Sequence, residues 1–320
     1  MKIIDLLSKK ILVTGGSGFL GSYLAAELER SGVPRENIFI PRAKEYDLTE
    51  LEHYDKAFQI FSPDIVIHAA AKVGGIGYNI TYPVSIFRDN LKMALNILEL
   101  SSRYAVEKLT IVGSACMYPG ELIGNFKEED LLNGPLHPTV EVYGFSKRAL
   151  LLGARAYARE HGLNFSFVVP TNLYGPRDTF DPDRSHVVSA LIRKFVDAKQ
   201  DGKDEVVCWG TGNAYREFIF AGDAAEAIVR LTQIEQFSDP LNIGTGIGTS
   251  IRELAEMIAG IVGFRGKTTW DHSRPDGAMR KVLDISRMKE VLGWEPALSL
   301  REGLKKTIDW YAENRKRLGY

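Results

Sequence analysis

Tyr143 and Lys147 are the first residues whose types and spacing suggest chemistry. They stand four positions apart in a segment that opens a helix, so both side chains would lie on one helix face. An ammonium beside a phenol stabilises the phenolate and lowers the pKa of the tyrosine, which prepares the pair for proton transfer. Proton transfer at a C–O group accompanies hydride transfer, so the pair predicts an oxidoreductase if a dinucleotide also binds.

Ser114 and Cys116 follow a run of apolar residues and offer a hydroxyl and a thiol two positions apart. If the backbone stays extended there, the two side chains point to the same side. Ser114 is suited to hydrogen-bond a substrate carbonyl, and a stabilised Cys116 thiolate is suited to act as a base. Spacing alone leaves open that Cys116 is a small buried apolar residue, the commoner position of a free cysteine. We expect Cys208, in an apolar strand, to belong to the core.

A glycine-rich turn near the start of the chain, Thr14-Gly-Gly-Ser-Gly-Phe-Leu-Gly21, predicts a dinucleotide site. Its first glycine permits a tight turn, its second the approach of a pyrophosphate, and its third close packing of the following helix. The N-terminus of that helix adds free N–H donors. After the next strand, Arg42 and more weakly Lys44 stand where an acidic residue would bind the ribose of NAD. This favours NADP(H), with a solvated loop charge as the alternative.

The elements that would position these residues alternate between short β-branched strands and longer amphipathic helices. We expect strands at 11–14, 38–40, 64–68, 109–113 and 164–169, and helices at 19–31, 84–104 and 143–161. This alternation predicts an α/β fold with a doubly wound parallel (Rossmann) sheet, whose carboxyl edge binds the ligands. Capping-box patterns predict further helix starts at Thr49, Asp223, Ser250 and Ser299.

The second half of the chain is less regular. Residues 170–185 are expected to form a long ordered loop, followed by a helix at 186–199 and a strand at 206–209. We expect residues 1–172, with 216–243 returning to them, to form the cofactor domain. A smaller α+β substrate domain would be built mainly from residues 173–215 and 244–320. The ligands would lie in the cleft between the two domains.

Composition argues against several other classes of protein. The chain has 40 Lys and Arg against 41 Asp and Glu, and a net charge of −1 excludes a surface devoted to nucleic acid. No apolar stretch reaches the ~18 residues of a membrane helix, and we expect neither a membrane span nor a secretory signal. Two cysteines are too few for a disulfide framework or a structural zinc site, so we expect no metal and a reducing, cytoplasmic location.

Gly15 to Gly21, Tyr143 and Lys147 together resemble the extended short-chain dehydrogenase/reductase superfamily. Within it the chain resembles the GDP-L-fucose synthase family. These are bifunctional enzymes that act on GDP-4-keto-6-deoxy-D-mannose both as a 3,5-epimerase and as a 4-reductase. The segments that carry this narrower resemblance are Ala69-Ala-Ala-Lys-Val-Gly-Gly-Ile76, Gly113-Ser-Ala-Cys-Met-Tyr-Pro119, Pro170-Thr-Asn-Leu-Tyr-Gly-Pro176 and Ser185-His-Val-Val188. The resemblance continues through Arg216-Glu-Phe218 and Pro275-Asp-Gly277, and so covers nearly the whole chain.

The resemblance implies a role for each candidate residue. Tyr143 would protonate the C4 oxygen with support from Lys147, and Ser114 would orient the C4 carbonyl. Cys116 would remove the protons at C3 and C5, and His186 would deliver protons to the opposite face. The implied NADP(H) contacts are Gly15, Ser17, Gly18, Phe19, Leu20, Gly21, Arg42, Asp47, Leu48, Ala69, Ala70, Ala71, Lys147, Pro170, Asn172, Leu173 and His186. The implied contacts with the nucleotide sugar are Lys194, which could equally be a solvated helix charge, and Trp209, Arg216 and Asp276.

The resemblance also implies a homodimer built on the helices at 84–104 and 143–161, and its alternatives differ mainly in substrate. A related epimerase/reductase, or a 4-epimerase, acting on a different nucleoside-diphosphate hexose would share the fold. A 4,6-dehydratase typically has Asp-Glu where this chain has Ala115-Cys116. A non-catalytic NADP-binding protein is disfavoured because the serine, tyrosine and lysine are all present. Departures from the family pattern leave the exact hexose and nucleotide open; they are Ala115, Val140, Val142 and residues 178–184.

Overall fold

Six parallel strands form the larger sheet of the computed structural model, which describes residues 2–319. Their order across the sheet is β2 (Ile38–Phe39), β1 (Ile11–Thr14), β3 (Ile65–His68), β4 (Lys108–Val112), β5 (Phe165–Pro170) and β9 (Pro240–Ile243). Every residue of β1, β3, β4 and β5 is buried, as expected of strands covered on both faces. The predicted doubly wound parallel sheet is confirmed.

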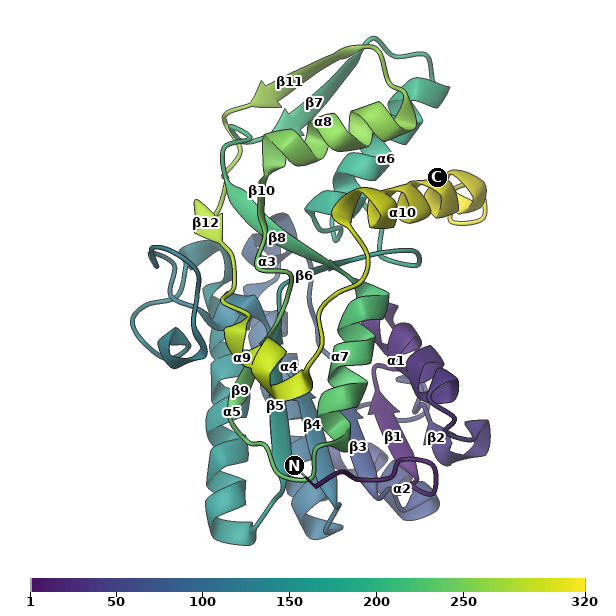
Figure 1. The fold of residues 1–320 in the computed structure, drawn as a ribbon, viewed down its shortest axis with the longest axis vertical. Helices are drawn as coiled ribbons and strands as arrows, with labels where there is room; N and C mark the ends of the chain where they lie inside the picture. Colours follow the sequence, from purple (N-terminus) through teal and green to yellow (C-terminus); the bar gives the residue numbers. More distant parts are fainter. Residues whose placement is uncertain (1, 320) are drawn as a thin grey trace.

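Long helices cover this sheet. α1 (Phe19–Arg30) packs against α7 (Ala221–Gln233), and α4 (Pro83–Arg103) packs against α5 (Glu141–His161). α2 (Leu51–Phe61) follows β2, the short helix α3 (Ile76–Thr81) precedes α4, and the short helix α9 (Ser286–Leu292) packs against α7 and β9 (Figure 1). The helices expected at 19–31, 84–104 and 143–161 occur with ends within two residues of the prediction.

A smaller unit stands at one end of the larger sheet, at the top of Figure 1. Its central strand β8 (Tyr215–Phe220) pairs with β6 (Asn172–Tyr174), β10 (Gly248–Ser250) and β12 (Arg280–Lys281). Beyond these lies a two-stranded sheet of β7 (Glu205–Trp209) and β11 (Lys267–Asp271). The helices α6 (Val187–Gln200), α8 (Ile251–Val262) and α10 (Leu300–Asn314) enclose a second apolar core around Phe195, Leu254 and Leu304.

Some of the helix starts predicted from capping-box patterns are confirmed by the structure, and others are wrong. Ser250 and Ser299 do form capping boxes with Glu253 and Glu302. The boxes predicted at Thr49 and Asp223 are wrong, because the N-cap position of α2 is Glu50 and that of α7 is Phe220, and neither side chain makes a capping hydrogen bond. The expected loop at 170–185 also contains the strand β6, which the sequence did not reveal.

Within residues 2–319, no helix is both long and apolar enough to cross a membrane. Within the same residues, no three His, Cys, Asp or Glu side chains gather in a group that could hold a metal ion. Cys116 and Cys208 are both free, the first half-buried and the second fully buried.

Candidate active site

A cleft of about 1890 Å³ lies between the carboxyl ends of the large sheet and the smaller unit. Pockets for one small molecule usually measure ~300–1000 Å³, so this cleft has room for a dinucleotide and a second nucleotide-sized ligand. Every site residue expected from the sequence lines it except Arg42 and the more weakly expected Lys44. Arg42 is exposed beyond the rim, although its neighbours Pro41 and Ala43 line the cleft.

The glycine turn takes the conformation that its spacing predicts. Gly15 has a φ of +67°, which favours glycine, and its carbonyl accepts from the Gly18 N–H at 2.8 Å. A Cβ on Gly21 would lie 2.0 Å from the Gly15 carbonyl oxygen, so only glycine permits this approach of helix to turn. No side chain caps α1, and its first turn holds no acidic residue. The helix therefore presents free N–H donors and a positive end to the cleft.

Thr14, the last residue of β1, connects the glycine turn to the end of the neighbouring strand β3. The Thr14 hydroxyl lies 2.9 Å from His68 Nδ1 and accepts from the Ala70 N–H at 3.1 Å. Burial, with a smaller effect from the Lys147 charge, lowers the pKa of His68 to about 3, so the imidazole stays neutral. The backbone of Ala69 to Ala71 is thereby fixed along the cleft beside Gly15.

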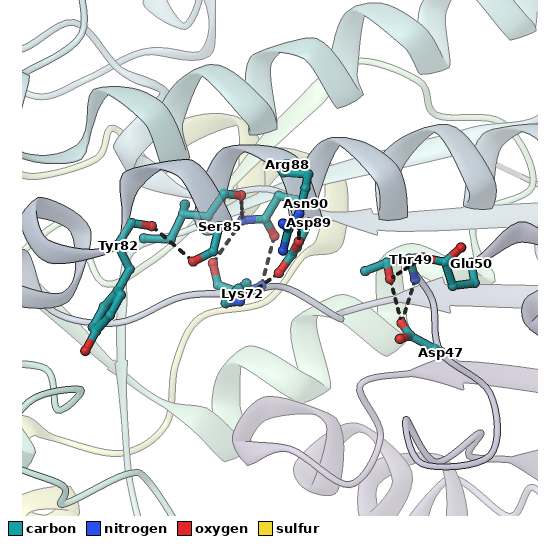
Figure 2. Close-up of polar contacts among 10 residues, drawn as sticks. Asp47, Thr49, Glu50, Lys72, Tyr82, Ser85, Arg88, Asp89 and Asn90 are labelled. Atoms are coloured by element: carbon teal, nitrogen blue, oxygen red, sulfur yellow. Dashed lines mark hydrogen bonds and ion pairs between the residues drawn. The ribbon is translucent and has the colours of Figure 1, made fainter.

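Helix α4 holds the chain just after these alanines (Figure 2). Buried Asn90 forms a reciprocal pair with the backbone of Lys72: its Oδ1 accepts from the N–H, and its Nδ2 donates to the carbonyl, both at 2.9 Å. Asp89 adds ion pairs at 2.7 Å with Lys72 and Arg88. Sequence reasoning missed Asn90, although an asparagine in the apolar stripe of an amphipathic helix was an available signal.

Figure 2 also shows why Thr49 does not cap α2. Its N–H and its hydroxyl both donate to Asp47 Oδ1, each at 2.9 Å. The two residues form a closed turn at the edge of the cleft, one residue before the helix cap at Glu50. Asp47 and Leu48 keep the position expected for cofactor contacts, but the Asp47 carboxylate is already engaged by this turn.

Helix α5 brings Tyr143 and Lys147 to the cleft on one buried face. Gly144 makes this possible, because a Cβ there would lie 2.3 Å from the Cys116 carbonyl oxygen. Lys147 Nζ donates to the Val112 carbonyl at 2.7 Å, and burial lowers its pKa to about 8. Burial raises the pKa of Tyr143, with a smaller contribution from Cys116, and a hydrogen bond with Ser114 opposes that rise. The lowering expected from Lys147 is not among these effects.

Ser114 and Cys116 both line the cleft, as expected, although the backbone does not stay extended beyond Ser114. Residues Ala115–Met117 form a 3₁₀ turn, and the Ser114 hydroxyl caps it by accepting from the Cys116 N–H at 3.1 Å. A hydroxyl that competes for backbone N–H groups favours such a turn over a continued strand. The turn leaves Cys116 half-buried instead of in the core.

Lys281 is a site residue that sequence reasoning missed. Its Nζ lies 3.7 Å from Cys116 Sγ, and it reaches the thiol from β12 of the smaller unit. The two residues are 165 positions apart, and β12 has only two residues, so no local pattern announced the contact.

His186 is the N-cap residue of α6 and lines the cleft from the smaller unit. One turn into that helix, the Ser189 hydroxyl donates to the carboxylate of Asp178. Asp178 is buried, which raises its pKa, while the charge of His186 acts in the opposite direction. A carboxylate is thus enclosed beside the imidazole, in the segment where this sequence departs from the family pattern.

The four residues expected to contact a nucleotide sugar lie together around β7 and β8. Trp209 is half-exposed, with Lys194 Nζ 5.6 Å and the Arg274 guanidinium 4.9 Å from its ring centre. Arg216 donates to the Asp276 carbonyl at 3.0 Å, and burial lowers its pKa. Arg274 also lines the cleft and was missed in the sequence.

Two of these side chains have structural partners as well. The Asp276 carboxylate accepts from the Thr211 N–H and hydroxyl, both at 2.8 Å, which joins two loops of the smaller unit. Lys194 Nζ donates to the Val207 carbonyl at 2.7 Å, and burial lowers its pKa. Lys194 is therefore not the freely solvated helix charge that was its alternative.

Known proteins resemble this chain in sequence and in fold. Residues 11–244 match the model of the NAD dependent epimerase/dehydratase family. The chain is 42% identical to GDP-L-fucose synthase 1 of Arabidopsis thaliana over 307 residues, which are 96% of this chain and 94% of the relative. A GDP-L-fucose synthetase from Naegleria fowleri, solved bound to NADP, superposes with a TM-score of 0.89 at 29% identity, covering 98% of this chain and 96% of that one. A GDP-6-OMe-4-keto-L-xylo-heptose reductase from C. jejuni gives a TM-score of 0.89 at 28% identity, covering 98% and 99%.

Proposed function

Because the chain belongs to the NAD dependent epimerase/dehydratase family, we propose that it converts GDP-4-keto-6-deoxy-D-mannose to GDP-L-fucose. The reaction is a 3,5-epimerisation followed by an NADPH-dependent reduction at C4. The observation that carries the proposal is that a single cleft contains two separate acid–base sets beside the dinucleotide turn. One set is Tyr143, Lys147 and Ser114, and the other is Cys116 and His186.

NADP(H) fits the larger unit. The uncapped N-terminus of α1 suits the pyrophosphate, and the close approach of Gly15 to Ala70 leaves the backbone of both strand ends facing the cleft. The other residues assigned to the cofactor are those named from the sequence, and Arg42, which is exposed next to cleft-lining Pro41 and Ala43, would pair with the 2′-phosphate. When bound, NADPH supplies the hydride for C4.

Tyr143 is the proton donor in the reduction. Its burial raises the pKa of the phenol, so the phenol stays protonated and can give its proton to the C4 oxygen. The Ser114 hydroxyl holds that oxygen and also contacts Tyr143. Lys147 is buried on the same face of α5 as Tyr143 and also lines the cleft, so its ammonium would support the developing phenolate and would hold the ribose of the cofactor.

Cys116 and His186 perform the epimerisation. The C4 ketone acidifies the neighbouring C3–H and C5–H bonds, so a thiolate at Cys116 can take these protons and leave an enolate. His186 belongs to the other unit of the cleft and delivers a proton to the opposite face. The ammonium of Lys281 stabilises negative charge on the sulfur.

Cations and an aromatic ring suit the nucleoside diphosphate. Lys194 and Arg216 would pair with phosphate oxygens, with Arg274 beside them and Trp209 providing a stacking surface. Asp276 orders the Thr211 loop beside them. We assign residues 1–172 and 216–243 to cofactor binding and residues 173–215 and 244–320 mainly to substrate binding.

The test is to incubate the protein with NADPH and GDP-4-keto-6-deoxy-D-mannose in heavy water and to identify the product by NMR. We expect one NADPH consumed per GDP-L-fucose formed, with deuterium at C3 and C5. Tyr143→Phe should lower NADPH oxidation by ~10²–10⁴-fold and keep the exchange, while Cys116→Ser should lower the exchange. Tightly bound NAD⁺ with no net consumption of NADPH would identify a 4-epimerase instead. Turnover only with another GDP-4-keto sugar would change the substrate.

We also propose a homodimer built on α4 and α5. Val84 and Leu95 on α4 and Leu152 on α5 are 74%, 63% and 51% exposed, and Phe87 stacks on Phe145 between the two helices at 6.2 Å. Large apolar side chains left exposed on two helices that pack together favour an association surface there. Light scattering should give twice the chain mass for the wild type and a monomer for Leu95→Glu/Leu152→Glu.

Two free cysteines suit the reducing cytoplasm, where we place the protein.

A further inference from the structure

The Gly74–Gly75 turn belongs to a segment typical of the family, but the chemistry proposed above gives it no role. In the structure this turn begins α3 and lines the cleft. The Gly75 N–H donates to the Arg184 carbonyl at 3.1 Å, so a residue of the larger unit is bonded to the segment that leads into α6.

Space requires the glycine at position 75. A Cβ there would lie 2.5 Å from the carbonyl oxygen of Ser185, closer than real Cβ atoms approach. The φ of Gly75 is −62°, which any residue adopts, so backbone conformation does not explain the glycine. Ser185 directly precedes His186, so the contact lies one residue from the proposed acid.

The turn itself is held rigidly from its own side. Buried Asn79 donates through Nδ2 to the carbonyls of Gly74 and Gly75, at 2.8 and 3.0 Å. The ring of Tyr78 lies 5.6 Å from the Arg184 guanidinium and adds a second contact with the same segment. Because these contacts hold the turn in place, the turn cannot shift to make room for a side chain at position 75. Ser185 must move instead.

The same turn meets the smaller unit at a second point. Ile76 Cδ1 lies 3.1 Å from the position of a Cβ on Gly277, and Arg216 Nη2 lies 3.2 Å from it. Residues 75 and 76 thus touch the segment before His186 and the segment beside the proposed substrate arginine. The two contacts join the larger unit to the smaller one at two points along the cleft.

We infer that the Gly74–Gly75 turn is a positioning device that sets His186 at the face of the sugar opposite Cys116. The inference rests on the function proposed above. In the inversion step, the C–H bond breaks as its proton passes to the Cys116 thiolate, and its electron pair enters the enolate conjugated with C4. The imidazolium of His186 then gives its proton to the same carbon from the other side, leaving a neutral imidazole. Only this second transfer depends on where α6 begins.

Gly75→Ala tests this separation. Its methyl group must push Ser185 away by about 0.5–1 Å, and a misplacement of ~1 Å can lower a rate by about 100-fold. The matched control is Gly77→Ala, because a Cβ at Gly77 meets no atom within 4 Å. The substrate carries deuterium at C3 and C5, and four quantities are measured: deuterium loss, inverted product, NADPH affinity and thermal midpoint.

We expect Gly75→Ala to form inverted product about 10–100-fold more slowly than Gly77→Ala, and we expect His186→Asn to show the same selective loss. Deuterium loss catalysed by Cys116, NADPH affinity and the thermal midpoint should stay within about twofold or a few degrees of the control. If Gly75→Ala fails to fold, Asn79→Ala, which frees the turn without adding bulk, should give the same split.

Two outcomes would overturn the inference. In the first, Gly75→Ala inverts the sugar as fast as Gly77→Ala. In the second, deuterium loss and NADPH affinity fall together with inversion, which indicates a general structural defect. A wild-type protein that neither exchanges deuterium nor oxidises NADPH fails differently, because that result rejects the proposed function itself.

Discussion

Lys281 and Cys116 are the pair of side chains whose meeting matters most at the scale of single residues. An ammonium 3.7 Å from a sulfur stabilises the thiolate that a carbon base requires. At ~4 Å the attraction between unit charges is about 1–4 kcal/mol, depending on how much water screens it. The cation comes from a two-residue strand of the smaller unit, so the base depends on both units of the protein.

We expect Lys281→Met to lower the rate of deuterium exchange at C3 and C5 by about 10–100-fold at neutral pH, as the attraction above requires. Lys281→Arg keeps the positive charge, so its rate of deuterium exchange should fall much less. Exchange is measured by NMR at saturating substrate, so that weaker binding is separated from slower chemistry. Equal losses in the Met and Arg variants would show that shape, and not charge, matters at this position.

Glu217 shows how elements are joined around the cleft. It lies on β8 and is fully buried, and its carboxylate accepts from the N–H groups of Thr245, Gly246 and Leu283. These donors belong to the loop after β9 and the segment after β12, so one side chain fastens three parts of the fold. Gly244 leaves room for it, because a Cβ there would lie 2.0 Å from Glu217 Oε1.

Glu217→Gln should destabilise the protein by ~2–5 kcal/mol, because the new amide turns donors toward N–H groups that need acceptors. Guanidinium unfolding measures the difference, and Glu290→Gln, at an exposed position on α9, is the control. A loss below about 1 kcal/mol would mean that the loops rearrange to satisfy the amide.

The elements also show what the sequence could and could not predict. Apolar runs and helix periodicity located β1, β3 and the long helices because each signal is local. Two capping boxes were wrong because another partner competes for each capping residue. The Thr49 hydroxyl donates to Asp47, two residues away, whereas Asp223 accepts from the N–H of Leu298, 75 residues away, instead of capping its own helix. Contacts such as Lys281 with Cys116 depend on tertiary packing between distant segments, which no spacing records.

At the scale of the whole molecule, Lys108 makes stability depend on pH. It is fully buried on β4, with only two hydrogen bonds of 3.3 Å, to Asn164 Oδ1 and the Glu235 carbonyl. Burial lowers its pKa from 10.5 to about 8, although Glu235 acts in the opposite direction. Below pH 8 the folded protein must therefore carry a desolvated charge that the unfolded chain keeps in water.

The sign of the effect follows from these two pKa values. The unfolded chain binds the Lys108 proton more tightly, so the penalty is complete below about pH 8 and disappears as the pH rises toward 10.5. As the pH rises from about 8 to 10.5, we expect the free energy of unfolding of the wild type to increase by about 3 kcal/mol relative to that of Lys108→Met. Urea unfolding of both proteins at each pH measures this gain, and the similar effect of Lys147 cancels in the difference. Lys56 is exposed, so the difference in unfolding free energy between the wild type and the control variant Lys56→Met should not change between these two pH values.

The half-buried thiol in the cleft has a practical consequence. The only other cysteine in the chain, Cys208, has no exposed surface, and burial raises the pKa of its thiol. An alkylating reagent should therefore modify this protein once, at Cys116, and the mass shift should vanish when a nucleotide sugar covers the sulfur. The native chain thus carries a single-site reporter, with which ligands can be ranked by protection from labelling before any substrate has been turned over.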